Sequence, residues 1–212
     1  MGIRIKKYFE DGVFSFFLKV LNYIKKKYLG IWRVIILESK LKNTCFKKNT
    51  KLKLSFRLAT KKDIKEMDNE KYGYSINSKK YFINRLEKGD RCILALYDKK
   101  IIGYLWAMKD FMEITQHKHI ALSKDKVYLF NAFVLKEFRG QRIITVMHEY
   151  ICDILKKEGK RIVVLVIDAD NKSSLKTRYR CGDKRIGIII RVRFFGLKYD
   201  YINKKVLFYL QN

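Results

Sequence analysis

The sequence predicts an α/β domain that begins near residue 54 and follows a basic N-terminal extension. At 212 residues, the chain is long enough to bury one sizeable core. Its 48% hydrophobic and 14% aromatic content excludes a wholly disordered protein. From residue 54 onward, strand-like alternation and helix-like periodicity follow one another along the chain. We therefore divide the chain into an extension, residues 1–53, and a domain, residues 54–212.

The overall charge favours anionic partners. The chain has 48 Lys and Arg against 21 Asp and Glu, a formal net charge of +27. It also has no proline and is rich in Lys, Ile, Asn, Tyr and Phe, as expected from a biased coding composition. The placement of the charge is therefore more informative than its sum. Because no nucleic-acid reading motif is present, we do not expect a nucleic-acid partner.

The extension contains a predicted basic amphipathic helix. Its apolar positions recur at helical spacing, at Val13, Phe17, Val20, Ile24 and Tyr28. Lys19 interrupts the apolar run, so a membrane span is not expected, and no small-residue cleavage site marks a secretory signal. Two interpretations stay open: the apolar face packs on the domain or a partner subunit, or residues 1–30 lie on an anionic membrane surface. A short strand, 31–37, and a polar connector, 40–53, follow.

The first half of the domain reads as a strand, two helices and a hairpin. A strand at 54–58 leads to Thr60 and Asp63, which are spaced as in a capping box, and a helix to about residue 69. A second helix, 78–88, ends before Gly89. Strands 91–97 and 101–109 are joined by a polar turn at 98–100. His117 and His119 have no Cys or third His nearby, so we expect them in a loop and predict no metal site.

The second half alternates strands and helices. In order, we expect a strand at 127–134, a helix at 143–157 that ends at Gly159, a strand at 161–167, a helix at 171–180, and strands at 185–193 and 204–209. The four cysteines, Cys45, Cys92, Cys152 and Cys181, lie far apart without a CxxC pair. This spacing predicts reduced thiols in a cytosolic protein.

Two short segments contain the functional signal. Strand 127–134 runs through Arg139-Gly140-Gln141-Arg142 into a helix, and such a loop presents backbone N–H groups and positive charge to a phosphate. The next strand is followed by Asn171 and Ser174 at the start of another helix. Together with the order of elements from residue 54 onward, these segments resemble the GNAT acetyltransferases. The resemblance implies a mixed, mostly antiparallel sheet flanked by helices and acetyl-CoA as the co-substrate.

The phosphate-binding loop of that family has the pattern Q/R-x-x-G-x-G/A, and residues 139–144 align with it. Arg139 matches, whereas Arg142 and Ile144 stand where glycine and glycine or alanine belong. We expect Arg142 to offer its N–H without a positive φ, and Ile144 to crowd the cofactor. The cofactor-binding residues that the resemblance implies are Phe133, Val134, Arg139, Gly140, Gln141, Arg142, Ile143, Ile144, Thr145, Asn171 and Ser174.

The catalytic residues are less conventional. In the family, a tyrosine in the last main helix is the general acid for the leaving thiolate, but Arg178 occupies that position, and Asp183 replaces a later phenylalanine. Tyr179 is one residue away, a rotation of about 100° on a helix, and is our candidate acid. In a related subgroup Asn131 would be a carboxylate, so Glu113 is our candidate base. The Val134 backbone is the expected partner of the thioester carbonyl.

The resemblance implies transfer of an acetyl group from acetyl-CoA to an amine of an unidentified acceptor, an anionic small molecule or glycan precursor. The alternative is a catalytically degenerate protein that binds or scaffolds and associates with membranes through its N-terminal helix. A homodimer is compatible with either function. We expect a cytoplasmic location, with peripheral contact at the inner membrane face as a further alternative.

Overall fold

The computed structural model describes residues 29–41, 52–67, 69–73, 76–115, 118–195 and 197–212. The amphipathic helix and most of the connector predicted in the extension lie outside these residues. In chain order the strands are β1 (Leu29–Lys40), β2 (Ser55–Leu58), β3 (Arg91–Tyr97), β4 (Lys100–Met108), β5 (Phe111–Thr115), β6 (Lys118–Ala121), β7 (Lys126–Val134), β8 (Ile162–Asp168), β9 (Lys184–Phe194) and β10 (Leu197–Ile202). The helices are α2 (Lys61–Glu66), α3 (Asn69–Tyr72), α4 (Ile76–Glu87), α5 (Ile143–Lys157), α6 (Lys172–Arg180) and α7 (Lys204–Gln211), with a 3₁₀ turn at Lys136–Phe138.

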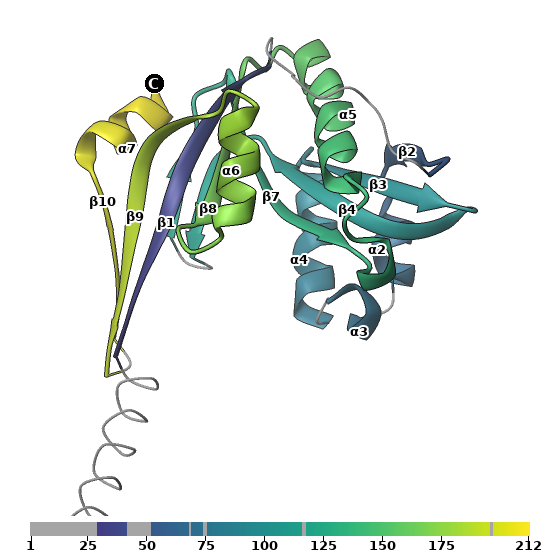
Figure 1. Ribbon diagram of the computed structural model, residues 1–212, viewed down its shortest axis with the longest axis horizontal. Helices are drawn as coiled ribbons and strands as arrows, with labels where there is room; N and C mark the ends of the chain where they lie inside the picture. Colours follow the sequence, from purple (N-terminus) through teal and green to yellow (C-terminus); the bar gives the residue numbers. More distant parts are fainter. Residues whose placement is uncertain (1–28, 42–51, 68, 74–75, 116–117, 196) are drawn as a thin grey trace, which may run out of the picture.

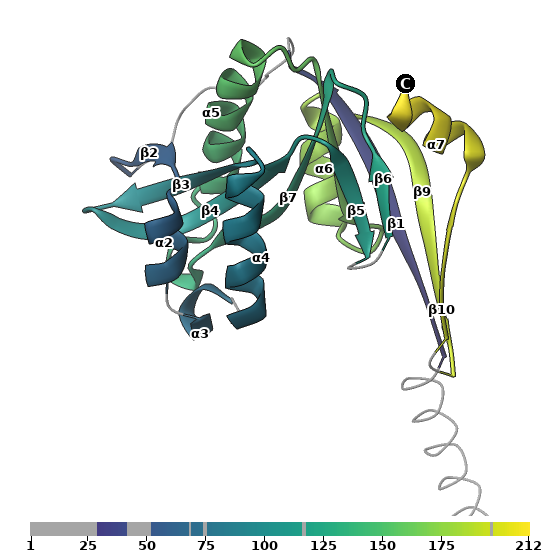
Figure 2. The same ribbon diagram turned by 180° about the vertical axis from the view of Figure 1, so that it is seen from behind.

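Eight of the strands form one twisted sheet in the order β10-β9-β1-β8-β7-β4-β3-β2. Neighbours are antiparallel except β7 and β8, which run parallel. Helices α5 and α6 lie on one face of this sheet, and α2, α3 and α4 lie on the other (Figures 1 and 2). The expected α/β fold with a mixed, mostly antiparallel sheet is therefore confirmed.

Strand β1 is an interior strand, although it comes from the segment that we assigned to the extension. It pairs with β8 from Val34 to Lys40 on one side and with β9 from Leu29 to Glu38 on the other. Ile36 and Leu37 are fully buried. The strand predicted at 31–37 is therefore longer than expected and belongs to the core of the sheet. The division at residue 53 stays a prediction.

Two expectations about elements are wrong. Residues 204–209 form helix α7 rather than a strand, because Asn203 caps the chain there by accepting a hydrogen bond from the Lys205 N–H at 2.8 Å. The last strand is instead β10. His119, expected in a loop, lies on β6, which forms a two-stranded hairpin with β5. This hairpin and α7 cover a second apolar cluster around Ile36 and Ile189.

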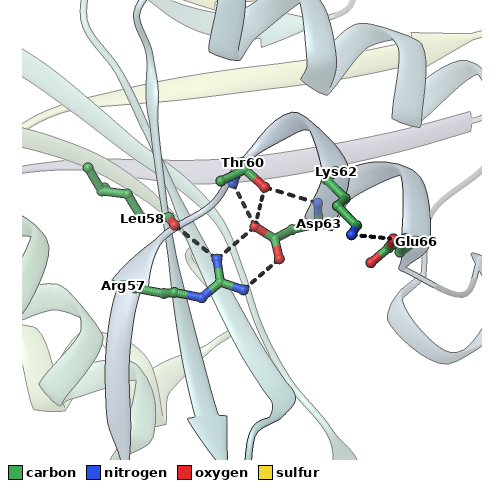
Figure 3. A network of polar contacts seen from close by, with 6 residues as sticks. All are labelled: Arg57, Leu58, Thr60, Lys62, Asp63 and Glu66. Atoms are coloured by element: carbon green, nitrogen blue, oxygen red, sulfur yellow. Dashed lines mark hydrogen bonds and ion pairs between the residues drawn. The ribbon is translucent and has the colours of Figure 1, made fainter.

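The turns follow the chemistry expected of them. Asp98 and Lys99 both adopt positive φ, 47° and 63°, as a tight two-residue β-hairpin turn requires. At the start of α2, the Thr60 side chain accepts from the Asp63 N–H, and the Asp63 carboxylate accepts from the Thr60 N–H at 2.7 Å. Arg57 completes this network with two bonds to the same carboxylate, at 2.6 and 2.7 Å (Figure 3). The network fixes the corner between β2 and α2.

We expect Asp63→Asn to lower the free energy of unfolding by about 1–2 kcal/mol at pH 7, because it removes the negative charge at a helix start. The bonds from Arg57 hold the pKa of Asp63 well below its usual value. Because the pKa of Asp63 is lower in the folded than in the unfolded protein, the carboxylate contributes its full stabilisation above the unfolded pKa. This contribution to the free energy of unfolding is lost progressively as pH falls below about 4. Urea unfolding should therefore show the difference between the two proteins shrinking from pH 7 to pH 3.

Asp153→Asn is the matched control, because Asp153 is a partly exposed carboxylate that lies 3.8 Å from the Lys156 Nζ. This variant should stay within about 0.5 kcal/mol of the wild type at pH 7. A pH-independent gap for Asp63→Asn would contradict the assigned role of the carboxylate.

Candidate functional site

A cleft opens in the sheet where β7 and β8 separate. Their parallel pairing ends at Leu129 and Leu165, whereas β8 continues beside β1 as far as Asp168. The register between β4 and β7 shifts between Tyr104 and Trp106, so β7 has one residue more than β4 over this stretch. Such a bulge bends its strand. Asn131 within it adopts a φ of 47°. The outer half of β7 is thus directed away from β8. Figure 1 shows the two strands diverging near α6.

The cleft has a volume of about 570 Å³ and continues into a second hollow of about 1130 Å³. The two share lining residues from the first turns of α5 and α6, so they form one continuous groove. The shared residues are Ile144, Thr145, Ser173, Ser174 and Thr177. The inner part is walled by the separated strands β7 and β8, and the outer part by the loop that precedes α5. We call this combined space the groove.

The loop before α5 presents a run of unpaired donors. The first backbone bond of the helix runs from the Val146 N–H to the Arg142 carbonyl, at 3.1 Å. In the part of the chain that the structure describes, the N–H groups of residues 140–145 have no protein acceptor. They stand at the positive end of a 15-residue helix. This part of the groove is therefore suited to an anion such as a phosphate.

Arg142 corrects one expectation about this loop. We expected it to need no positive φ, but it caps α5 in the left-handed conformation, with φ 59° and ψ 19°. Gly140 is also left-handed, with φ 80°. The chain therefore keeps the backbone conformation that glycine favours while placing an arginine in it, at some conformational cost. The Arg142 side chain is exposed and lines the outer groove.

Two interactions fix the position of the end of β7. The Arg139 Nε donates to the Val134 carbonyl at 3.0 Å, which ties the loop back to the strand. On the neighbouring strand β4, a Cβ added at Gly103 would lie 2.7 Å from the Phe133 carbonyl oxygen. The close approach of the two strands therefore requires glycine at position 103. Val134 itself is 5% exposed and lines the outer groove.

Asn171 and Ser174, the second motif found in the sequence, form the N-terminal cap of helix α6 and also lie in the groove. Asn171 is the N-cap of α6, and its side-chain oxygen accepts from the Ser174 N–H at 3.1 Å. Both residues line the groove. Their spacing is therefore accounted for by the start of the helix alone, and that start forms one wall of the groove.

Arg178 lies at the base of the groove in a buried polar cluster. Its Nε donates to Asp183, and its NH2 donates to the His148 Nε2 at 3.1 Å. Burial, together with the Arg178 charge, lowers the pKa of His148 to about 3. Because Nε2 accepts from Arg178, we assign the imidazole proton to Nδ1, 3.6 Å from the Cys152 sulfur. His148 is therefore neutral and is not available as a base.

Asp183 balances the charge of Arg178. Its side chain is fully buried, and burial raises its pKa, a rise that the ion pair with Arg178 opposes. The arginine in place of the family tyrosine and the aspartate in place of the later phenylalanine are therefore partners. The groove gains a fixed cation held by a buried carboxylate.

The structure does not bring Glu113 or Tyr179 to the groove. Tyr179 is 45% exposed and lies on the outer side of α6 beside Lys176. Glu113 lies on β5, where it accepts a hydrogen bond from the Tyr81 hydroxyl at 2.9 Å. Burial and this bond raise the pKa of Tyr81. The catalytic roles of Glu113 and Tyr179 stay predictions.

Most of the predicted cofactor-binding residues do line the groove. They are Val134, Arg139, Gly140, Arg142, Ile143, Ile144, Thr145, Asn171 and Ser174. Gln141 belongs to the loop without lining the hollow, and Phe133 stacks on Tyr104, with ring centroids 5.3 Å apart. Sequence reasoning missed His148, Thr177 and Asp168. Asp168 could have been found from the sequence. It directly follows the strand predicted at 161–167, and ligands of open α/β sheets bind at the carboxyl ends of such strands.

Two features are absent from the described residues. These residues contain no group of three or more His, Cys, Asp or Glu side chains arranged to hold a metal ion. No helix among them combines the length and the apolar character that crossing a bilayer requires.

The fold and the groove define an acyltransferase-type α/β protein, and comparison with known proteins identifies the family. The model of the acetyltransferase (GNAT) family matches residues 61–182, more than half of the chain. The chain therefore belongs to the GNAT acetyltransferase family. No curated protein matches it.

Solved structures share the fold at low sequence identity. An acetyltransferase of the GNAT family from Colwellia psychrerythraea matches 82% of this chain with 13% identity and a TM-score of 0.55, and 62% of its own length is covered. A conserved protein of unknown function from Staphylococcus epidermidis matches 84% of this chain with 14% identity and a TM-score of 0.53, and 67% of it is covered.

A third match is the GCN5-related glucosamine N-acetyltransferase region of a fungal multi-domain GH3 β-N-acetylglucosaminidase, with 16% identity and a TM-score of 0.55. The match covers 83% of this chain and 22% of that one. The chain thus spans less than two thirds of the Colwellia protein and about a fifth of the fungal protein.

We expect His148 to remain neutral, with its proton on Nδ1, throughout pH 5–8, because burial and Arg178 both disfavour the imidazolium. Long-range ¹H–¹⁵N correlation spectra report imidazole tautomer and charge directly, and the chain has three histidines. Replacing Arg178 with Met removes one of the two causes and should raise the pKa of His148. Titration of His148 near pH 6.5 in the wild type would contradict the assigned cluster.

Proposed function

We propose that the protein transfers an acetyl group from acetyl-CoA to an amine. The observation that supports this proposal is the meeting of two features in one groove: the opening between β7 and β8, and the unpaired N–H groups of residues 140–145. The N–H groups are suited to the pyrophosphate, and the opening is suited to the extended pantetheine arm. The unpaired edge of β8 beyond Leu165 offers that arm backbone partners.

In the transfer, the acceptor nitrogen forms a bond to the thioester carbonyl carbon, and the carbon–sulfur bond breaks. The coenzyme leaves as a thiolate that gains a proton, while the amine loses one. Negative charge develops on sulfur, so a cation in the groove stabilises the transition state. Arg178 supplies that cation at the position of the family tyrosine. A guanidinium does not release its proton near pH 7, so its contribution is electrostatic.

For the proton lost by the amine, we propose Asp168 as the acceptor. Among the described residues, it is the carboxylate that lines the inner groove. It sits at the end of β8, is exposed, and accepts a hydrogen bond from the Asp170 N–H at 2.8 Å. Glu113, our candidate from the sequence, is the competing base and lies on β5 outside the groove lining. The two carboxylates can be distinguished by substitution.

We expect Asp168→Asn to lower kcat by about a hundredfold or more, because a general base contributes roughly 10²–10⁴ to the rate. Glu113→Gln should leave kcat within about twofold of the wild type and serves as the matched carboxylate-to-amide control. Release of the coenzyme thiol, followed with a thiol reagent, measures both. The reverse pattern would assign the base to Glu113.

The acceptor is proposed to be anionic, because the chain has a net charge of +27. The fungal match is a glucosamine N-acetyltransferase region, and glucosamine is an amino sugar. Amino sugars with and without a phosphate are therefore suitable first acceptors in the thiol-release assay, with spontaneous hydrolysis of acetyl-CoA subtracted.

The substitution Ile144→Glu tests the binding of acetyl-CoA. Ile144 is 45% exposed and lines both parts of the groove beside the unpaired N–H groups. A glutamate in the first turn is favourable for the helix but competes with a phosphate for the same donors. We expect isothermal titration to show acetyl-CoA binding weakened by about tenfold or more.

Leu58→Glu is the matched control, because it changes the net charge equally at a 37% exposed leucine of β2. Its affinity for acetyl-CoA should equal that of the wild type. Absence of any binding by the wild-type protein at millimolar acetyl-CoA would reject the enzymatic function. It would favour the alternative of a degenerate domain that binds or scaffolds.

A further inference from the structure

One face of the sheet is left uncovered where β1, β9 and β10 extend past α6 (Figure 1). Facing residues of antiparallel strands share a side of the sheet, and alternate residues along a strand do too. Ile31 faces Val192, which faces Tyr199; two residues away, Phe194 faces Leu197. All five side chains therefore lie on one face, which we call the apolar face.

The apolar face belongs to the α6 side of the sheet. Ile188 precedes Ile190 and Val192 by two and four residues on β9, so the three side chains share one side of the strand. Ile188 packs on the main core cluster, as does Leu175 of α6. Beyond that cover the side chains are open to solvent. Ile31 and Leu197 are each 72% exposed, Tyr199 is 65% and Phe194 is 56%. Contiguous apolar exposure of this kind marks an interaction surface.

The strands that present the apolar face are strongly basic. Strands β1, β9 and β10 contain seven Lys and Arg and two acidic residues, Glu38 and Asp200. By the same alternation, Arg191 and Arg193 lie on the face opposite the apolar one. Both acids are engaged: Glu38 accepts from the Tyr209 hydroxyl, and Asp200 lies 3.3 Å from the Arg191 Nε. The uncompensated cations of this region include Arg33, which is exposed and lies on the apolar face opposite Ile190. The excess of positive charge on these three strands favours an anionic partner surface.

The described chain also begins at this end of the molecule. Leu29 pairs with Phe194, so the N-terminal segment joins the structure beside the apolar face. The sequence of that segment contains seven Lys and Arg against two acids in residues 1–28, with apolar residues at helical spacing. The segment that precedes Leu29 in the sequence is therefore basic as well.

We propose that the apolar face docks on the surface of an anionic lipid bilayer. Aromatic side chains are favoured at the level of the headgroups, and Tyr199 and Tyr201 supply them on this face. Each lysine or arginine near an anionic surface adds about 1 kcal/mol of attraction. A second copy of this chain is a poorer occupant, because it would bring a further seven cations close to the same basic strands.

The test is co-sedimentation of the full chain with vesicles of phosphatidylcholine alone or mixed with phosphatidylglycerol. We expect binding to the mixed vesicles that weakens as salt is raised. The triple variant Ile31→Ser, Phe194→Ser and Leu197→Ser should lose about tenfold or more in partition coefficient, because three exposed apolar side chains no longer enter the interface. Unchanged binding of this variant would overturn the proposal, even if the N-terminal segment still binds.

Phe208→Ser is the matched control. Phe208 is 70% exposed, but it lies on α7, whose buried residues Val206 and Leu210 pack on the other apolar cluster. This variant should bind like the wild type.

Analytical ultracentrifugation of the wild type and the triple variant tests the competing occupant. A dimer that the triple variant disrupts would assign the face to a second copy and overturn the lipid proposal. Equal acetyl-CoA affinity of the wild type and the triple variant would show that lost vesicle binding reflects lost docking rather than unfolding.

Discussion

The parting of β7 from β8 after Leu129 is the constraint on which the rest of the site depends. Parallel strands whose pairing continued would close the sheet and leave no space between them. The extra residue in β7, with Asn131 at positive φ, turns the strand outward, and glycine at position 103 lets β4 follow it closely. The loop at the end of β7 then brings its N–H groups to the mouth of the opening. One local irregularity thus creates both the space and its anion-binding end.

Arg178 shows how a departure from a family pattern can be coherent. Considered singly, Arg178 and Asp183 are two losses of expected residues, and each alone would bury an unpaired charge. In the structure they form one ion pair, and His148 accepts a hydrogen bond from the same guanidinium. A buried cation at position 178 is therefore tolerated because Asp183 is its counter-ion. The same pair deprives His148 of a role as base.

Sequence periodicity predicted the elements that rest on local signals, such as β3, the hairpin turn at Asp98 and helix α5 with its glycine cap. It failed where long-range packing decides. Apolar residues in α7 also fit a strand, and the Asn203 cap settled the choice. The interior place of β1 depends on pairing with strands more than 100 residues away. In the site, backbone motifs around Gly140 and Asn171 were predictable, whereas the cluster around Arg178 needed the fold.

Strand β1 links the two surfaces for which we propose functions. On one side it pairs with β8, whose free edge walls the groove, and on the other with β9, which bears the apolar face. Ile35 and Leu37 anchor it in the core, whereas Ile31 is open to solvent four residues earlier. The exposed end is paired with β9 from Leu29 onward, and the same ladder continues without a break into the buried part of the strand as far as Ile36. Docking at the exposed end would therefore fix the orientation of the groove relative to the docked surface, without any motion within the sheet.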